Sequence, residues 1–122
     1  ICMGQALREA LGDKQGIARF GSALVPMDDA LCMAVVDLSG RPYLHFNAPM
    51  PCAKVGDFDT ELVEEFMRAL ANHGQLTLHI DLLHGSNTHH VVEATFKALA
   101  LALRQAVAID AAECVPSTKG VL

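Results

Sequence analysis

The order of apolar segments predicts an α+β fold, in which one helix precedes a β-β-β-α-β-α unit. The segments with the apolar or β-branched content of strands are 16–27, 30–38, 43–47 and 75–83. The segments with apolar residues at the three- and four-residue spacing of helices are 1–11, about 59–72 and about 89–108. Three strands precede the first internal helix without strict strand–helix alternation, which favours α+β over a parallel α/β sheet.

The composition is that of one compact domain. The 122 residues are 52% hydrophobic and 19% charged, with a net charge of −5. So acidic a chain lacks the basic surface that binds nucleic-acid phosphates, and no apolar run reaches the roughly 18–20 residues of a membrane span. The four cysteines have no CxxC spacing, so we expect them to be reduced and mostly buried, in a cytoplasmic setting. We therefore predict neither a nucleic-acid nor a membrane partner.

The first helix is expected at 1–11, because its apolar residues recur at helical spacing. Gly12 stands where a glycine commonly ends a helix. No capping residue precedes Ile1, so the sequence looks like a piece whose beginning lies upstream.

An internal echo predicts a tandem repeat. ALREAL at 6–11 matches ALRQAV at 102–107, an offset of 96 residues. Repetition at a fixed offset indicates related structural units. We therefore predict that 1–13 is the final helix of a first half-domain and that 14–122 form a second half-domain.

Turn residues separate the early strands. Pro26 and the pair Asp28 and Asp29 break the first strand, and the Ser-Gly-Arg-Pro sequence at 39–42 has the composition of a turn. The Pro- and Gly-containing segment 49–57 is expected to be a loop. These short connections predict hairpin-like links between the first three strands.

The middle helix is expected to bury one apolar face. Asp59 or Thr60 can cap its start, and Gly74 is expected to end it. The residues expected to point inward are Leu62, Phe66, Ala69 and Leu70. The residues expected to face solvent are Glu61, Glu65, Arg68 and Asn72.

A polar stripe marks the last helix, whose start reads GSNTHHVVEATFK at 85–97. Ser86, Asn87 and Thr88 can cap this helix. On a helical wheel the stripe consists of His89, Glu93, Lys97 and Arg104, and nearly every other residue is apolar. His90 lies about 100° from His89, at the edge of the stripe.

Two interpretations of the stripe remain open from these residues. In one, it is a solvated face on which Glu93 and Lys97 form an i,i+4 ion pair. In the other, His89, His90 and Glu93 bind divalent metal, since neutral imidazole and carboxylate suit Mn, Fe, Zn and related ions. The positive end of the helix dipole disfavours protonation of the two imidazoles. Because adjacent histidines diverge on a helix, they would serve different ions, and further ligands would come from elsewhere.

Several segments together resemble one known family. They read RFGSALVPMDDAL, VDLSGRP, FDTELVEEF, GSNTHHVVEATFKALALALRQA and VPSTKGVL. They are similar to imidazoleglycerol-phosphate dehydratase, an enzyme of histidine biosynthesis. The resemblance runs from the first residue to the last and corresponds to roughly the C-terminal two thirds of a typical member. The combination of HHVVEATFK with PSTKG is highly specific.

The resemblance implies a fold and a cofactor. The family consists of two tandem α+β half-domains of the ribosomal-protein-S5-domain-2-like type, each with an HHxxE helix start. It implies two Mn²⁺ ions per active site, shared between subunits of a cytoplasmic homo-oligomer in which trimers assemble into a 24-mer. His89, His90 and Glu93 would then be catalytic metal ligands. Glu65 would be a further metal ligand, at a position where many relatives have histidine.

The resemblance also implies a reaction, the dehydration of imidazole glycerol phosphate to imidazole acetol phosphate. The metal ions would act as Lewis acids and as a template for this small phosphorylated imidazole substrate. Arginine grips phosphate oxygens as a fork and lysine as a point charge. The residues that match substrate-holding positions, chiefly for phosphate, are Arg19, Arg41, Lys97, Ser117 and Lys119.

Each of these roles has an alternative. Arg19 and Arg41 can be ordinary surface charges, the residues from Ser117 to Lys119 can be a frayed tail, and Glu65 can be a solvated residue. The first HHxxE copy would fall before Ile1, so an inactive fragment or a non-catalytic binding module of the same fold is the alternative function. RNA binding is disfavoured by the acidic charge and by an aromatic content of 5%.

Overall fold

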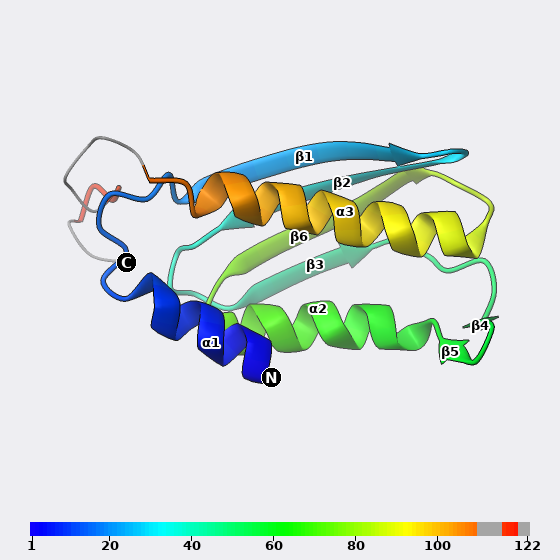
Figure 1. Ribbon diagram of the computed structural model, residues 1–122, viewed down its shortest axis with the longest axis horizontal. Coiled ribbons are helices and arrows are strands. Elements are labelled where there is room, and N and C mark those ends of the chain that lie inside the picture. The colour runs from blue at the N-terminus through cyan, green and yellow to red at the C-terminus, as the bar shows by residue number, and fades with distance from the viewer. Residues whose placement is uncertain (110–115, 120–122) are drawn as a thin grey trace.

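A mixed β-sheet covered on one face by helices forms the body of the protein. The computed structural model describes residues 1–109 and 116–119. The elements are α1 (Cys2–Leu11), β1 (Phe20–Met27), β2 (Ala30–Asp37), β3 (Tyr43–Asn47), β4 (Lys54–Val55), β5 (Phe58–Asp59), α2 (Glu61–Gly74), β6 (Thr77–His84) and α3 (Thr88–Ala106). Helix α3 packs against β1 and β2, α2 lies beside β3, and α1 packs on α2 (Figure 1). The predicted α+β class and strand–helix order are confirmed.

The four-stranded sheet has the order β1-β2-β6-β3. Strands β1 and β2 form an antiparallel hairpin, and β2 also pairs antiparallel with β6. Strand β3 runs parallel to β6 at the other edge, and the connection between these two strands passes through α2. The expected hairpin link is therefore right for β1 and β2 but wrong for β2 and β3, because β6 enters between them.

The core lies between the sheet and the helices. Along β2, burial alternates strictly, so that Ala30, Cys32, Ala34 and Val36 face the helices. Small residues on α3 allow it to approach closely, and they include Ala94, Ala98, Ala102 and Ala106. The opposite face of the sheet has no helix on it in Figure 1, and it carries exposed Leu24 and Tyr43.

Helix α2 differs from the prediction in the direction of its apolar face. Its core residues are Val63, Met67, Leu70, Ala71 and Gly74, whereas Leu62 is 48% exposed and Phe66 is only partly buried. The face expected to meet solvent does so at all four positions. The inward direction is shifted because α2 packs on α1 as well as on the sheet.

The end of α2 also differs from the prediction. Gly74 is the last helical residue, and the left-handed cap is Gln75, with φ of 52°. Gly74 lies against Gly4 of α1, where an added Cβ on Gly4 would stand 2.8 Å from the Gly74 nitrogen. The glycine therefore serves the α1–α2 contact instead of the turn.

Three smaller features complete the description. The expected loop 49–57 contains the short strand β4, which pairs with β5. Cys32 is buried, but Cys2 and Cys52 are exposed, so the expectation of mostly buried cysteines is wrong for the described residues, and Cys114 lies outside them. No helix in the described part of the chain is both long and apolar enough to span a membrane.

Candidate functional site

The start of α3 displays the predicted histidine pair. Asn87 is the N-cap, and its Oδ1 accepts a hydrogen bond from the His90 backbone N–H at 3.2 Å. This cap places His89 and His90 in the first helical turn and Glu93 in the second. The side chain of His89 is 61% exposed, while that of His90 is 23% exposed.

The turn between β1 and β2 reaches the same place. Asp28 and Asp29 form its two-residue loop, and Asp28 adopts φ of 46°, which aspartate tolerates better than most residues. Oδ2 of Asp29 accepts hydrogen bonds from Ser86 N at 2.6 Å, Ser86 Oγ at 2.9 Å and Asn87 N at 3.0 Å. Its Oδ1 lies 2.6 Å from Nδ1 of His90. The hydrogen bond with His90, followed by those from Ser86 and Asn87, holds the pKa of Asp29 well below its usual range.

Two ion pairs continue along the helix. Nε2 of His89 lies 3.2 Å from Oε2 of Glu93, whose other oxygen, Oε1, lies 2.6 Å from Nζ of Lys97. The Lys97 hydrogen bond is the main reason that the pKa of Glu93 is lowered. The rings of His89 and His90 diverge, with an interplanar angle of 70° and centroids 6.0 Å apart. Glu93 is therefore an ionised acceptor between an imidazole and an ammonium group.

A basic cluster lies at the opposite end of the sheet. Arg19 precedes β1 and donates from Nε to Oδ1 of Asp37 at 2.7 Å and from NH1 to the Pro116 carbonyl at 2.8 Å. Arg41 precedes β3 and is exposed, with NH1 3.5 Å from the Ser39 carbonyl. The eight residues of β1 separate this end from the Asp28–Asp29 turn by about 26 Å.

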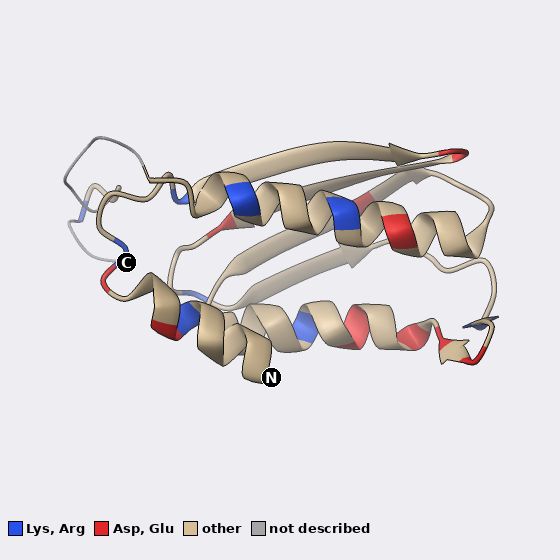
Figure 2. Cartoon of the chain, viewed as in Figure 1, with Lys and Arg blue, Asp and Glu red and all other residues tan. Residues whose placement is uncertain are grey.

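The C-terminal described segment joins the basic cluster. Ser117 Oγ accepts a hydrogen bond from the Lys119 backbone N–H at 3.2 Å, and the Pro116 carbonyl binds Arg19. In Figure 2, Lys and Arg residues lie at this end together with acidic ones, and the acidic β1–β2 turn lies at the other end. Within one chain, therefore, the histidine pair lies far from the predicted phosphate-holding residues Arg19, Arg41, Ser117 and Lys119.

Comparison with known proteins identifies the family. The family model of imidazoleglycerol-phosphate dehydratase matches residues 1–103. The chain belongs to this dehydratase family.

Relatives in the dehydratase family match the whole chain. It is 64% identical over 124 aligned residues to the imidazoleglycerol-phosphate dehydratase of Roseobacter denitrificans and 63% identical over 122 to that of Desulforudis audaxviator. All of this chain is covered in both alignments, but only 64% and 62% of those proteins. The chain thus spans somewhat less than two thirds of the length of these curated relatives.

Solved dehydratase structures share the fold. The crystal structure of the Staphylococcus aureus enzyme matches with a TM-score of 0.87 and 53% identity, over 89% of this chain and 64% of that one. The Pyrococcus furiosus enzyme matches with a TM-score of 0.86 and 46% identity, over 100% of this chain and 66% of that one. The predicted resemblance and the half-domain fold are confirmed.

The predicted metal ligands do not all lie close to one another within this chain. Glu65 lies on α2 with its side chain 69% exposed, and its Oε1 is 3.9 Å from Nε of Arg68. Across residues 1–109 and 116–119, no three His, Cys, Asp or Glu side chains are arranged so as to hold a metal ion. His89, His90, Glu93 and Glu65 therefore remain predicted ligands.

The donor atoms at the start of α3 nevertheless suit a divalent metal. Nδ1 of His90 faces the Asp29 carboxylate, which leaves Nε2 on the other side of the ring, 3.5 Å from Oδ2 of Asp28. A histidine whose second nitrogen is held by a carboxylate is a common arrangement around bound metals. His89 and Glu93 offer a second nitrogen and oxygen on the adjacent face.

Sequence reasoning missed the part played by Asp28 and Asp29, which it treated only as residues that end a strand. Two carboxylates in a two-residue hairpin loop were visible, but their contact with residues 86–90 depends on β6 pairing with β2, and that pairing places the end of β6 beside the β1–β2 turn. Strand order is not encoded in any local pattern.

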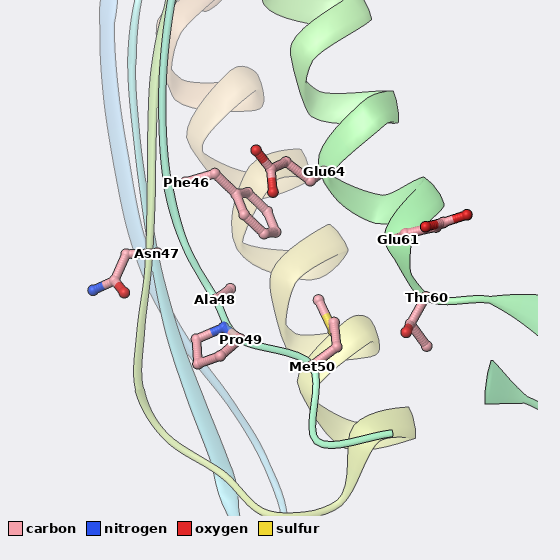
Figure 3. A pocket seen from close by; sticks show the side chains of 8 residues that line it. All are labelled: Phe46, Asn47, Ala48, Pro49, Met50, Thr60, Glu61 and Glu64. Carbon is pink, nitrogen blue, oxygen red and sulfur yellow. The ribbon is translucent and has the colours of Figure 1, made fainter. Parts of the chain in front are cut away.

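Two surface hollows lie at the end of the molecule where α3 begins. One, of about 330 Å³, is lined by Cys52, Lys54, Val55, Ser86, Asn87, Thr88 and His89. The other, of about 290 Å³, lies between the end of β3 and the start of α2 and is lined by Phe46, Asn47, Ala48, Pro49, Met50, Thr60, Glu61 and Glu64 (Figure 3). None of the predicted site residues lines the second hollow, whereas His89 lines the first. The first hollow is therefore the one that belongs to the candidate site.

Proposed function

We propose that this chain supplies the second-half residues of an active site that dehydrates imidazole glycerol phosphate to imidazole acetol phosphate in histidine biosynthesis. The observation that carries the proposal is the arrangement at the start of α3, where two diverging imidazoles and an ionised carboxylate are presented together. Family membership makes this reaction the natural interpretation.

The metal proposed for this site is Mn²⁺, two ions per site, with His89, His90, Glu93 and Glu65 as ligands from this half. Imidazole nitrogen and carboxylate oxygen bind such ions well. When bound, the metal supplies Lewis-acid stabilisation of negative charge that develops on the substrate. The remaining ligands would come from residues outside this chain.

The residues of this chain have distinct proposed roles. His89 and His90 orient the imidazole end of the substrate, and the Glu93 carboxylate accepts hydrogen bonds beside them. Arg19, Arg41, Ser117 and Lys119 hold the phosphate from one end of the sheet, with Arg19 gripping as a fork and lysine as a point charge. Lys97, which pairs with Glu93 on α3, contacts the phosphate from the histidine side of the site.

The location proposed for the site is an interface between copies. The histidine pair and the basic residues beside Pro116 stand about 26 Å apart in one chain, which is too far for one small substrate to touch both. A substrate held at once by both clusters therefore needs clusters from different subunits. We propose the trimer-based 24-mer of the family as the assembly, acting in the cytoplasm.

The direct test combines metal content with turnover in the complete protein. We expect Mn²⁺-dependent release of imidazole acetol phosphate, followed by NMR, with loss of activity on chelation and recovery on adding Mn²⁺. His90→Ala should abolish turnover, and His73→Asn, in the last turn of α2 and outside the site, should leave it unchanged. Unchanged activity in His90→Ala refutes the ligand assignment.

A non-catalytic module of the same fold is the second candidate. It is favoured by Glu65, a predicted ligand whose side chain is 69% exposed and lies 3.9 Å from Arg68 on the same helix. Metal content per subunit separates the two candidates, since a module binds substoichiometric metal and shows no turnover. Sedimentation analysis measures the assembly, and a monomeric mass would contradict the shared site.

A further inference from the structure

The Asp29 carboxylate connects two parts of the candidate site that are 61 residues apart in the chain. Its Oδ2 atom receives hydrogen bonds from the backbone and hydroxyl of Ser86 and from the backbone of Asn87. Its Oδ1 atom is left for Nδ1 of His90, at 2.6 Å. Oδ2 therefore caps the loop before α3, and Oδ1 contacts the imidazole.

The contact with Oδ1 determines which ring nitrogen of His90 carries the hydrogen. An ionised carboxylate only accepts hydrogen bonds, so Nδ1 must carry the hydrogen in the neutral imidazole. Oδ2 of Asp28 also lies near this ring, but its distance to Nε2 is 3.5 Å, so the 2.6 Å contact at Nδ1 is the stronger one. The lone pair is then on Nε2, the atom that can coordinate metal. The neighbouring His89 has a different arrangement, because its close carboxylate contact, with Glu93 at 3.2 Å, is at Nε2 instead of Nδ1, and its side chain is far more exposed.

We propose that Asp29 is a positioning residue that fixes the Nδ1–H tautomer and the ring orientation of His90, and so keeps Nε2 available as a ligand. The proposal deepens the proposed function, because it rests on His90 as a metal ligand. Asp29 itself touches neither metal nor substrate in this role. A residue that only capped the loop would need Oδ2 and not Oδ1.

An isosteric substitution separates positioning from capping. In Asp29→Asn, the three donors from Ser86 and Asn87 require an oxygen where Oδ2 now lies, so the amide NH2 must point at His90. The amide then donates to Nδ1, and the imidazole proton moves to Nε2. The cap is retained, but the atom that should bind metal carries a hydrogen.

The tautomer is measured in the metal-free assembled protein with ¹⁵N-labelled histidine, by magic-angle-spinning NMR at about pH 9, where imidazoles are neutral. The His90 signal is assigned by its loss in His90→Gln. We expect hydrogen on Nδ1 in the wild type and in Asp29→Glu, and on Nε2 in Asp29→Asn. Hydrogen on Nδ1 in Asp29→Asn, or on Nε2 in the wild type, overturns the proposal.

Mn²⁺ affinity, measured by electron paramagnetic resonance, tests the consequence. We expect Asp29→Asn to bind Mn²⁺ about 10- to 100-fold more weakly, with most of the affinity restored in Asp29→Glu. Ser86→Ala, which removes one donor to Oδ2 and leaves the His90 contact, should change neither tautomer nor affinity. Asp57→Asn, on an exposed turn, is the charge control.

The two proposals fail in different ways. If the wild type has the Nδ1–H tautomer but binds no Mn²⁺, the proposed function fails while the Asp29–His90 relationship stands. If Mn²⁺ binds and Asp29→Asn leaves affinity within about twofold of the wild type, or if Ser86→Ala weakens it equally, the positioning role is wrong and the metal site stands.

Discussion

Arg19 contacts Asp37 through two guanidinium nitrogens, with Nε 2.7 Å from Oδ1 and NH2 3.3 Å from Oδ2. The pair joins the residue before β1 to the last residue of β2, and both side chains are mostly buried. NH1 of Arg19 also donates to the Pro116 carbonyl. A guanidinium has five N–H donors, so these contacts leave two for the proposed contact with a phosphate.

Asp37→Asn should therefore destabilise the fold. Arg19 would keep its charge in a mostly buried position and lose an ionic acceptor, which we expect to lower the free energy of unfolding by about 1–2 kcal/mol. Urea unfolding at one protein concentration measures this. Asp57→Asn, on an exposed turn, should change stability by less than about 0.5 kcal/mol, and an equal effect of the two variants would contradict the proposed importance of the pair.

Gly21→Ala should be far more damaging. A Cβ at this position would stand 1.9 Å from the Ala102 carbonyl oxygen and 2.8 Å from the Ala106 nitrogen. Helix α3 would have to move away from β1, carrying the histidine pair with it, so we expect a loss of more than about 4 kcal/mol or no folded protein. Ser22→Ala, at the next and exposed position of β1, should fold normally, as judged by circular dichroism.

Much of the fold followed from local patterns, because the signals for strands and helices lie within a few residues. The span of β3 and the cap at Asn87 are examples. Three features depended on distant partners instead. The direction of the α2 core face is set by α1, the parallel pairing of β3 depends on β6, and the role of Asp29 depends on that same strand order.

The candidate site was predicted unevenly for the same reason. His89, Glu93 and Lys97 lie on one helix, so their shared face follows from helical spacing alone. Arg19 and Arg41 were found through the family resemblance, and only the folded sheet shows that they lie far from the histidines. A site divided between subunits, as proposed above, would leave no signature in the spacing of one chain.

Asp81 should give the stability of this protein an acid-dependent component. Its Oδ1 lies 3.1 Å from Nδ2 of Asn47 and 3.2 Å from Nε2 of His45. The Asn47 hydrogen bond, with smaller help from His45 and against partial desolvation, lowers the pKa of Asp81. A native pKa below the unfolded value of about 3.9 means that the ionised carboxylate stabilises the fold above that pH, and that this contribution is lost as pH falls through the native pKa.

Asp81→Asn tests this dependence. We expect it to lower the free energy of unfolding at pH 5 by about 0.5–1 kcal/mol, a small value because the site is partly exposed to solvent. The difference from the wild type should begin to shrink below the unfolded pKa of about 3.9 and should disappear once the pH is below the lowered native pKa, where the folded carboxyl is protonated too. Urea titrations across this range measure it, and a difference independent of pH would contradict the role of the charge.

Gln75→Gly should stabilise the protein, because the residue that caps α2 in the left-handed conformation is Gln75 and not the expected Gly74. Gln75 holds the left-handed conformation at φ of 52°, a position at which glycine has no Cβ penalty. The substitution loses the hydrogen bond from Gln75 Nε2 to the Asn72 carbonyl, but that bond is exposed and worth little. We expect a gain of about 0.5–1 kcal/mol in the free energy of unfolding.

Ala100→Gly is the matched control for this effect. Ala100 is exposed in the middle of α3, where glycine has no conformational advantage, so the same kind of replacement should cost about 1 kcal/mol. Opposite signs for the two glycines in urea unfolding would show that backbone conformation decides the outcome. A loss of stability in both variants would mean that Gln75 is held by its side-chain contact and not penalised by its backbone.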